Sequence, residues 1–359
     1  MHTLFIPGPT WVDDGARVAM SGQMMPHRAE DFVALYEQSQ PILRAMAGTQ
    51  RPVYLATCSS WGMMEAVLRN TVRPRGRVLN CCCGAFSDRW HDVARRCGLQ
   101  ADALRVPWGE TITPNLLADA LSGGSYDLVT LVHAETSTGV LNPLQELSAV
   151  VRAFPSVLLA VDVVSSYSAV PLQMDQWGID VVLAGTQKAL ALPPGMTICA
   201  VSNRAIERAK SVEERGFYLD FLEYERQARS SMTISTPNIP LVMGLAYRAR
   251  EIAREGLATR YERHAQCSQF VRDWAENHGW ASVPPRGREA TTLSCLRPKN
   301  GIDTVAFAHT LQEQSGFVID SGYGQWKGAC IRISNMGVMS PHELTPLIHG
   351  MLDAMTLFP

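Results

Sequence analysis

Apolar runs and helical patterns alternate along the first two thirds of the chain. Between about residues 52 and 202, short aliphatic runs are followed by stretches in which apolar residues recur every three or four positions. This alternation is typical of repeated strand–helix–strand units around a mostly parallel sheet. It predicts seven strands, at residues 52–57, 77–82, 101–106, 127–133, 157–162, 180–184 and 197–202. It also predicts five covering helices, at residues 61–70, 86–97, 115–121, 144–153 and 203–209.

The pattern changes at Pro240, where two long helices are predicted on either side of a break at Gly256. The predicted elements are helices at 240–255 and 257–277, a strand at 291–296, a helix at 303–314, a strand pair near 317–320 and 329–334, and a closing helix at 341–355. We therefore expect three parts. They are an N-terminal segment (1–15) that contributes to the active site, a large α/β domain (16–255) and a smaller C-terminal α+β domain (256–359).

Composition narrows the possible partners. The 359 residues are 46% hydrophobic and 18% charged, which is typical of a globular protein and excludes disordered and fibrous classes. The net charge is only −2, and no basic stripe interrupts the sequence. Neither nucleic acid nor an anionic membrane surface is therefore an expected partner. We expect a small-molecule ligand.

The cysteines and the N-terminus bear on location. Nine cysteines are present, including the run Cys81-Cys82-Cys83, but no C-x-x-C pair occurs. This arrangement fits neither a disulfide framework nor a zinc site, and no metal site is expected. No segment approaches 18 uninterrupted apolar residues, and the N-terminus lacks the basic and apolar regions of a signal peptide. We expect a cytoplasmic protein that does not span a membrane.

Two predicted strands end in residues that carry chemistry. Asp162 ends an aliphatic run, and Lys188 follows the next run in an apolar turn. Carboxyl ends of parallel strands form the ligand-binding edge of such a sheet, and burial favours the neutral amine that can form a Schiff base. An Asp that caps a turn and a solvated loop lysine are the alternatives for each residue alone. Together they match the needs of pyridoxal 5′-phosphate, a carboxylate for the ring nitrogen and an amine for the aldehyde.

Five fragments resemble one known family, in the same order over essentially the whole chain. They are F-I-P-G-P-T at 5–10, P-H-R at 26–28, E-T-S-T-G-V at 135–140, A-V-D-V-V-S at 160–165 and A-G-T-Q-K-A at 184–189. Together they resemble class V aminotransferases, and within that class the alanine:glyoxylate and serine:pyruvate branch. The resemblance implies fold-type I, in which a large domain with a mostly parallel seven-stranded sheet carries a smaller C-terminal α+β domain.

The resemblance also implies a cofactor site for pyridoxal 5′-phosphate. By position, Lys188 is expected to hold the cofactor and shuttle the proton, and Asp162 is expected to pair with the pyridine nitrogen. The polar turn T-C-S-S-W-G at 57–62, before a predicted helix, suits a phosphate because helix N-termini attract anions. An ordinary serine N-cap is the alternative there. The remaining matched cofactor-binding positions are Ser59, Ser60, Trp61, Phe86, Thr136, Val164, Gln187 and Thr236.

Substrate and partner follow by the same resemblance. Arg332 interrupts an apolar strand and matches the arginine that receives the substrate α-carboxylate, with a buried structural ion pair as the alternative. Gly8 is expected to form a second wall of that site. Thr236 matches a residue that reaches the phosphate of a partner subunit, which implies a homodimer with shared active sites. A core phenylalanine and a helix entry are the alternatives for Phe86 and Thr236.

The predicted function is transamination by a ping-pong mechanism. No extra basic cluster is available for a distal carboxylate, so alanine or serine is expected as donor and glyoxylate or pyruvate as acceptor. Phosphonate and ureidoglycine substrates stay open, and Arg28 would change the preference if it faced the pocket. A cysteine desulfurase or lyase is disfavoured because Cys295 and Cys330 lie in strand-like runs. A non-catalytic α/β scaffold is a remote alternative, because no nucleotide-binding glycine motif occurs.

Overall fold

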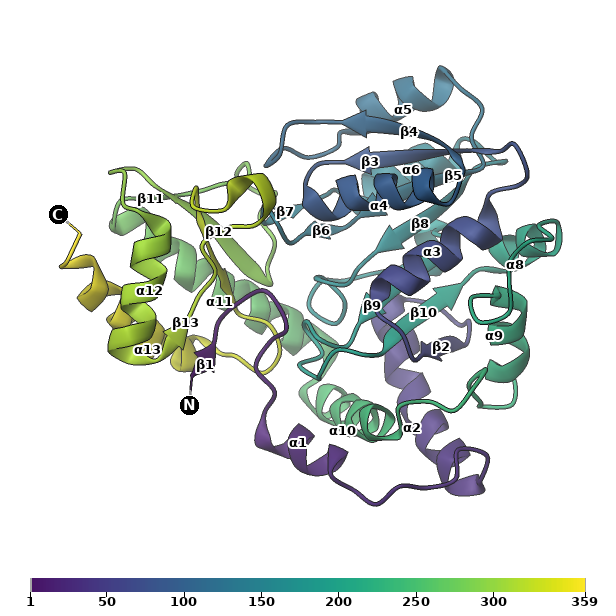
Figure 1. The fold of residues 1–359 in the computed structure, drawn as a ribbon, viewed down its shortest axis with the longest axis horizontal. Coiled ribbons are helices and arrows are strands. Elements are labelled where there is room, and N and C mark those ends of the chain that lie inside the picture. The colour runs from purple at the N-terminus through teal and green to yellow at the C-terminus, as the bar shows by residue number, and fades with distance from the viewer. Residues whose placement is uncertain (1, 359) are drawn as a thin grey trace.

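The aliphatic runs of the first two thirds form one seven-stranded sheet in the computed structural model, which describes residues 2–358 (Figure 1). The sheet order is β2-β10-β9-β8-β5-β3-β4. Only β10 runs against its neighbours, and the adjacent pairs among β9, β8, β5, β3 and β4 are parallel. The strands are β2 (Val53–Ala56), β3 (Arg77–Cys82), β4 (Gln100–Arg105), β5 (Leu128–Val132), β8 (Leu158–Asp162), β9 (Val181–Gly185) and β10 (Thr197–Val201). All seven were predicted, and the mostly parallel α/β fold is confirmed.

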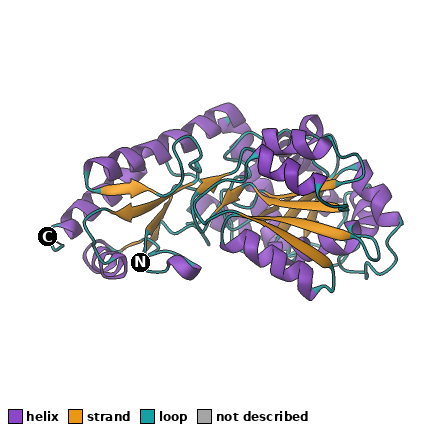
Figure 2. Cartoon of the chain, turned by 90° about the horizontal axis from the view of Figure 1, so that it is seen from above, coloured by secondary structure: helices purple, strands orange, loops and turns teal. Residues whose placement is uncertain are grey.

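Helices cover both faces of this sheet (Figure 2). The predicted ones are α3 (Ser60–Thr71), α4 (Ala85–Arg96), α5 (Pro114–Ser122), α6 (Leu144–Arg152) and α8 (Asn203–Lys210). Successive side chains of a strand point to opposite faces, so each buried strand serves two cores. In β8, Leu159 and Val161 pack into one hydrophobic cluster, whereas Leu158 and Ala160 pack into the other.

Several helices of the large lobe were not predicted. They are α1 (Asp14–Met20), α2 (Glu30–Ala47), the short α7 (Met174–Trp177) and α9 (Phe221–Ala228). The longest, α2, buries Phe32 and Tyr36 against the sheet but also buries Gln40. Gln40 Nε2 donates to Val53 O over 2.9 Å, and its Oε1 accepts from Val53 N over 3.0 Å. This buried amide therefore satisfies the backbone of the edge strand β2.

The second lobe is built from the C-terminal third. Gly256, at a φ of 80°, separates α10 (Ile239–Glu255) from α11 (Leu257–Asn277), as predicted. Three antiparallel strands follow, β11 (Trp280–Ser282), β12 (Leu293–Pro298) and β14 (Ile331–Ser334), with α12 (Thr304–Ser315) and α13 (Pro341–Met355). The hairpin of β6 (Ala134–Glu135) and β7 (Val140–Leu141) and the strand β11 were not predicted. Within residues 2–358, no helix combines the length and apolar character needed to cross a lipid bilayer.

The predicted strand pair near 317–320 and 329–334 is wrong in most of its length. β13 (Phe317–Val318) pairs in parallel with β1 (Thr3–Leu4) at the N-terminus, because Phe317 packs edge-to-face against Phe5 at 5.6 Å. Only Asp320 pairs with β14, through a single antiparallel bridge to Arg332. A short 3₁₀ turn, Gly324–Trp326, lies between Asp320 and Arg332 in the sequence. The domain boundaries given above stay a prediction.

Candidate active site

The carboxyl ends of β8 and β9 bring the two predicted catalytic residues to one edge of the sheet. Asp162 is the last residue of β8 and pairs with Leu183 of β9. Lys188 lies three residues beyond the end of β9. Both side chains are buried, with 4% of Asp162 and 8% of Lys188 exposed. The backbone N–H of Val164 donates to Asp162 Oδ1 over 2.7 Å, which fixes one carboxylate oxygen.

The N-terminal segment covers Lys188. Its Nζ donates to the carbonyl oxygen of Pro7, and the hydroxyl of Thr10 donates to the Lys188 carbonyl over 2.9 Å. Gly8 adopts a φ of 137°, and a Cβ at this position would lie 2.8 Å from Lys188 Cε. Any other residue would therefore be strained and would displace the lysine. Gly8 therefore borders the lysine, and its expected place as a second wall of the substrate carboxylate site stays a prediction.

Burial disfavours the charged forms of Lys188 and Asp162 and brings the pKa of each to about 7. Desolvation lowers the pKa of Lys188 to about 7, and the charge of Arg332 adds to this effect while Asp162 opposes it. Desolvation raises the pKa of Asp162 to about 7, opposed by the hydrogen bond from Val164. An isolated lysine in water is protonated at pH 7. Here the neutral amine is available near neutral pH, as nucleophilic and base chemistry require.

Glu135, which the sequence analysis did not single out, holds the start of α4. Its side chain is fully buried, and its Oε2 accepts from the backbone N–H and the hydroxyl of Ser87, each over 3.0 Å. Its Oε1 accepts from Phe86 N over 3.3 Å and from the Ser137 hydroxyl over 2.6 Å. A carboxylate is stabilised at a helix N-terminus by the helix dipole. Phe86 is thereby placed with its ring centre 5.8 Å from Lys188 Nζ.

The predicted phosphate turn forms a polar cradle at the start of α3. Ser59 is the exposed residue before the helix, and Ser60 is buried with its hydroxyl unpartnered among the described residues. A Cβ on Gly185 would lie 2.7 Å from Ser60 Oγ and 2.5 Å from Gln187 Oε1. The absent side chain thus leaves space for both polar groups beside Gly185. Trp61 stacks near Phe86, with the ring centres 6.4 Å apart.

Thr136 lies in the turn between β6 and β7, and Val164 follows the end of β8. The Thr136 hydroxyl contacts the hydroxyl of Ser165, and its carbonyl accepts from Arg332 Nη1 over 2.8 Å. Val164 is buried beside Asp162. These predicted cofactor residues are therefore brought into the region of Asp162 and Arg332. Direct contact with a cofactor stays a prediction for each of them.

Arg332 is buried in β14 and has a carboxylate partner. Its Nε donates to Asp320 Oδ1 over 3.0 Å, and Nη2 lies 3.0 Å from the same oxygen. The guanidinium carbon lies 5.4 Å from the centre of the Tyr323 ring. The ion pair that was the alternative for this residue is therefore present. It does not occupy the whole guanidinium, which has five N–H bonds.

Two other expected positions lie at the surface. Thr236 is exposed on the segment between α9 and α10, and the backbone N–H of nearby Asn238 donates to Thr57 Oγ1 over 3.1 Å. Arg28 is exposed on the turn before α2. Within one chain, the structure does not bring either residue into contact with Lys188. The contact of Thr236 with a partner subunit stays a prediction.

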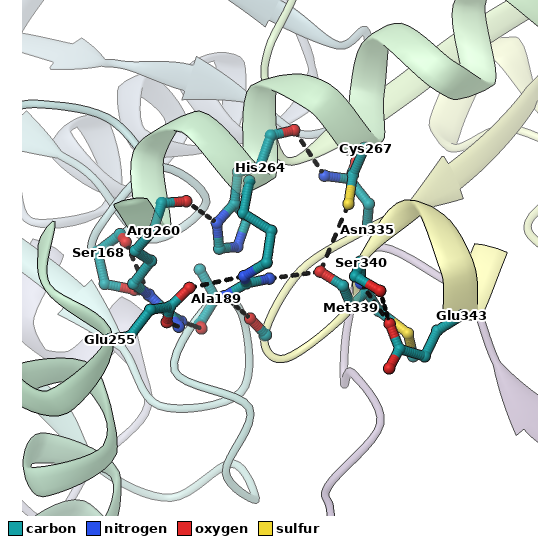
Figure 3. Close-up of polar contacts among 12 residues, drawn as sticks. Ser168, Ala189, Glu255, Arg260, His264, Cys267, Asn335, Met339, Ser340 and Glu343 are labelled. Carbon is teal, nitrogen blue, oxygen red and sulfur yellow. Dashed lines mark hydrogen bonds and ion pairs between the residues drawn. The ribbon is translucent and has the colours of Figure 1, made fainter. Parts of the chain in front are cut away.

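A buried cluster on α11 braces the turn that carries Lys188 (Figure 3). Arg260 Nη2 donates to the carbonyl of Ala189 over 2.7 Å, and its Nε donates to the carbonyl of Ser168 over 2.9 Å. Glu255 pairs with Arg260 at 2.9 Å and with Arg263 at 2.6 Å. Sequence reasoning missed Arg260 because a charged residue on a helix is usually solvated. Only Glu135 had a signal, its place in the E-T-S-T-G motif.

The cysteines considered for sulfur chemistry are internal. Cys295 lies in β12 and Cys330 directly before β14, and both are buried. Their sulfur atoms are 3.5 Å apart. Neither is therefore presented on an exposed loop.

Comparisons with known proteins extend these observations. A family model described as aminotransferase class-V matches residues 18–339. Curated relatives include a soluble hydrogenase small subunit from Synechococcus (28% identity; 97% of this chain and 91% of that protein). They also include a serine–glyoxylate aminotransferase from Methylorubrum extorquens (30%; 97% and 89%) and an L-aspartate–glyoxylate aminotransferase from Paracoccus denitrificans (29%; 94% and 87%). The crystal structure of an alanine–glyoxylate aminotransferase from Nostoc superposes with a TM-score of 0.93 (29% identity; 99% and 95%).

Proposed function

Because the chain belongs to the class V aminotransferases, we propose that it transfers an amino group between a small amino acid and a 2-oxo acid. The donor is alanine or serine and the acceptor is glyoxylate or pyruvate. The observation that carries this proposal is a buried lysine and a buried aspartate at adjacent strand ends, with a buried arginine whose guanidinium keeps free N–H bonds.

The cofactor of this enzyme class is pyridoxal 5′-phosphate, and the residues present fit it. The unpartnered Ser60 hydroxyl, the Gln187 amide and the start of α3 offer donors for a phosphate. Phe86 offers a flat face beside Lys188, and Asp162 offers a buried carboxylate for a ring nitrogen. When bound, the cofactor supplies an electron sink for the substrate Cα.

Lys188 and Asp162 then have separate roles. Lys188 would hold the cofactor through its aldehyde, and its Nζ, once freed, would take the proton from the substrate Cα as a base and return it as an acid. Before the cofactor binds, burial lowers the pKa of this amine to about 7, so a neutral amine is available near neutral pH. Asp162 holds a proton on the ring nitrogen. The Pro7 carbonyl accepts from Lys188 Nζ, and the Thr10 hydroxyl holds the Lys188 backbone, so the N-terminal segment positions this amine.

Arg332 receives the α-carboxylate that donor and acceptor share. A guanidinium binds a carboxylate through two parallel N–H bonds, which fixes the direction of the Cα–H bond. Names of relatives support serine and alanine as donors, and one supports L-aspartate. Among the described residues of one chain, no second arginine or lysine makes a polar contact with Arg332 or its partner Asp320, which favours the smaller donors. Buried Cys295 and Cys330 disfavour the desulfurase alternative.

The deciding experiment adds single amino acids to the purified, cofactor-loaded protein without an acceptor. We expect L-alanine or L-serine to bleach the visible absorbance of the cofactor, and glyoxylate or pyruvate to restore it. The Lys188→Ala variant should show neither change. If no amino acid changes the spectrum, but 2-aminoethylphosphonate or ureidoglycine does, the substrate assignment is wrong.

We also propose a homodimer in which Thr236 contacts the cofactor phosphate of the partner subunit. Its exposure within one chain supports this role. The test mixes Lys188→Ala with Thr236→Val subunits. A hybrid dimer with shared sites contains one site in which both residues are intact, so cofactor binding should recover. No recovery in proven hybrids would place Thr236 outside the site.

A further inference from the structure

The carboxylate partner of Arg332 is held in place by the backbone. Asp320 and Arg332 form an isolated antiparallel bridge, in which Arg332 N donates to Asp320 O over 2.7 Å and Asp320 N donates to Arg332 O over 3.2 Å. The same two residues are joined by their side chains. Asp320 therefore cannot move away from Arg332 without breaking the bridge. Its carboxylate is a fixed part of the arginine's surroundings.

The contacts of the Arg332 guanidinium use three of its five N–H bonds. Of its five N–H bonds, the Nε–H and one N–H on Nη2 face Asp320, and one on Nη1 donates to the carbonyl of Thr136. One N–H on Nη1 and one on Nη2 are left. Two N–H bonds are what a single carboxylate takes in a bidentate pair. Tyr323 lies over one face of the group and limits its rotation.

The charges around this site add a second constraint. Asp320 neutralises Arg332, and the other charged groups that act on Lys188 are Asp162 and Glu135, both negative. Among the described residues of one chain, the charged groups that act on Lys188 are thus one arginine and three carboxylates, which leaves no surplus positive charge there for a second acidic group. A buried site without surplus positive charge disfavours a dianionic ligand.

We infer that Asp320 is a positioning and specificity-determining residue, which aims Arg332 at the substrate α-carboxylate and restricts the donor to amino acids with one carboxylate. The inference rests on the proposed function and deepens it. An alternative in which Asp320 competes with substrate for Arg332 predicts the opposite sign. Removal of Asp320 would then tighten the binding of every carboxylate.

The test compares cofactor-loaded wild type with Asp320→Ala and Asp320→Asn. In the alanine variant Arg332 keeps its N–H bonds, but no carboxylate holds them in direction. KM for L-alanine and for pyruvate should therefore rise about tenfold, the scale of a lost charge-assisted contact. The asparagine variant keeps an oxygen acceptor and should show a smaller rise. Ethylamine, which is alanine without its carboxylate, should change the cofactor absorbance equally in all three proteins. Asp102→Asn, in a half-exposed pair between Asp102 of β4 and Arg77 of β3, is the matched control.

The specificity readout is the ratio of kcat/KM for L-aspartate to that for L-alanine. Loss of the aim of Arg332 lowers kcat/KM for both donors alike, so this effect cancels in the ratio. Removal of one negative charge favours L-aspartate, which carries two carboxylates. The ratio should therefore rise severalfold in both variants. If Asp320→Ala does not fold, the ratio in Asp320→Asn decides. An unchanged ratio, or a fall in KM for L-alanine, would overturn the inference. No response of wild type to any amino acid would instead overturn the proposed function.

Discussion

The surroundings of Lys188 favour the uncharged form of its amine. Its pKa is lowered to about 7, first by burial and then by Arg332. A substantial share of the cofactor-free protein therefore carries a neutral Lys188 near pH 7. A lysine with an ordinary pKa near 10.4 would be neutral in roughly one molecule in 2,500. The lysine is thus prepared for its reaction before any ligand arrives.

This pKa predicts the pH dependence of cofactor uptake. Only the neutral amine attacks an aldehyde, so the uptake rate should rise through pH 7 and level off above about pH 8. Stopped-flow absorbance with cofactor-free protein measures the rate, and a free primary amine corrects for titration of the cofactor. In Arg332→Gln the midpoint should move to higher pH, because a positive charge that lowers the Lys188 pKa is gone. A rate that climbs steadily to pH 10 in wild type would contradict the lowered pKa.

Asp162→Asn separates cofactor binding from catalysis. The amide keeps the shape of the carboxylate but cannot stabilise a protonated ring nitrogen. We expect retained cofactor and a fall in kcat of about 10- to 100-fold, the scale of a lost charge-assisted hydrogen bond. Single-turnover kinetics with L-alanine measure this rate. An unchanged rate would place the ring nitrogen away from Asp162.

At the scale of elements, Gly185, the last residue of β9, shapes the polar cradle at the start of α3. Gly185→Ala should weaken the cofactor while leaving the fold intact. The new Cβ would lie 2.5 Å from Gln187 Oε1 and 2.7 Å from Ser60 Oγ, and overpacking of this kind costs about 1–3 kcal/mol. Equilibrium titration with the cofactor should show a dissociation constant raised about tenfold or more. Gly123→Ala, whose Cβ would make an ordinary 3.5 Å contact at the end of α5, is the control.

Elements whose pattern follows from local burial could be predicted from the sequence. Strands β8 and β9 are continuous aliphatic runs because helices cover both faces, so their ends, and with them Asp162 and Lys188, could be placed in advance. Helix α2 could not, because its pattern includes Pro41 and a buried Gln40 whose role depends on Val53. The position of β13 was likewise set by a distant partner, β1.

The same limit applies to the candidate site. Lys188, Asp162 and Arg332 could be named from their strands and from the family motif. The contacts that hold Arg332 and the Lys188 turn come from residues that have no local signal, since Asp320 acts across a single bridge and Arg260 reaches a carbonyl 71 positions away. The hydrophobic pattern of a segment does not show which distant residue a buried charged side chain will contact.

At the scale of the whole molecule, the two lobes meet at the charged cluster on α11 (Figure 3). Arg263 Nη2 donates to the carbonyl of Gly337 over 3.1 Å, and Asn335 Nδ2 donates to the carbonyl of His264 over 3.2 Å. Arg260 extends the cluster to Ser168 and Ala189 of the large lobe. The cluster therefore connects the segment after β14 with the turn of Lys188.

Arg260→Met should destabilise the protein and loosen this turn. The side chain is 1% exposed, and its loss leaves Glu255 with one partner fewer and two carbonyls without a donor. Breaking a buried pair costs about 3–5 kcal/mol, which denaturant unfolding measures. The control is Arg254→Met, which removes an exposed ion pair with Glu251 within α10. It should cost less than about 1 kcal/mol. If Arg260 braces Lys188, the variant should also bind the cofactor more weakly under conditions where it is fully folded. Equal cofactor affinity in the two variants would limit Arg260 to a role in stability.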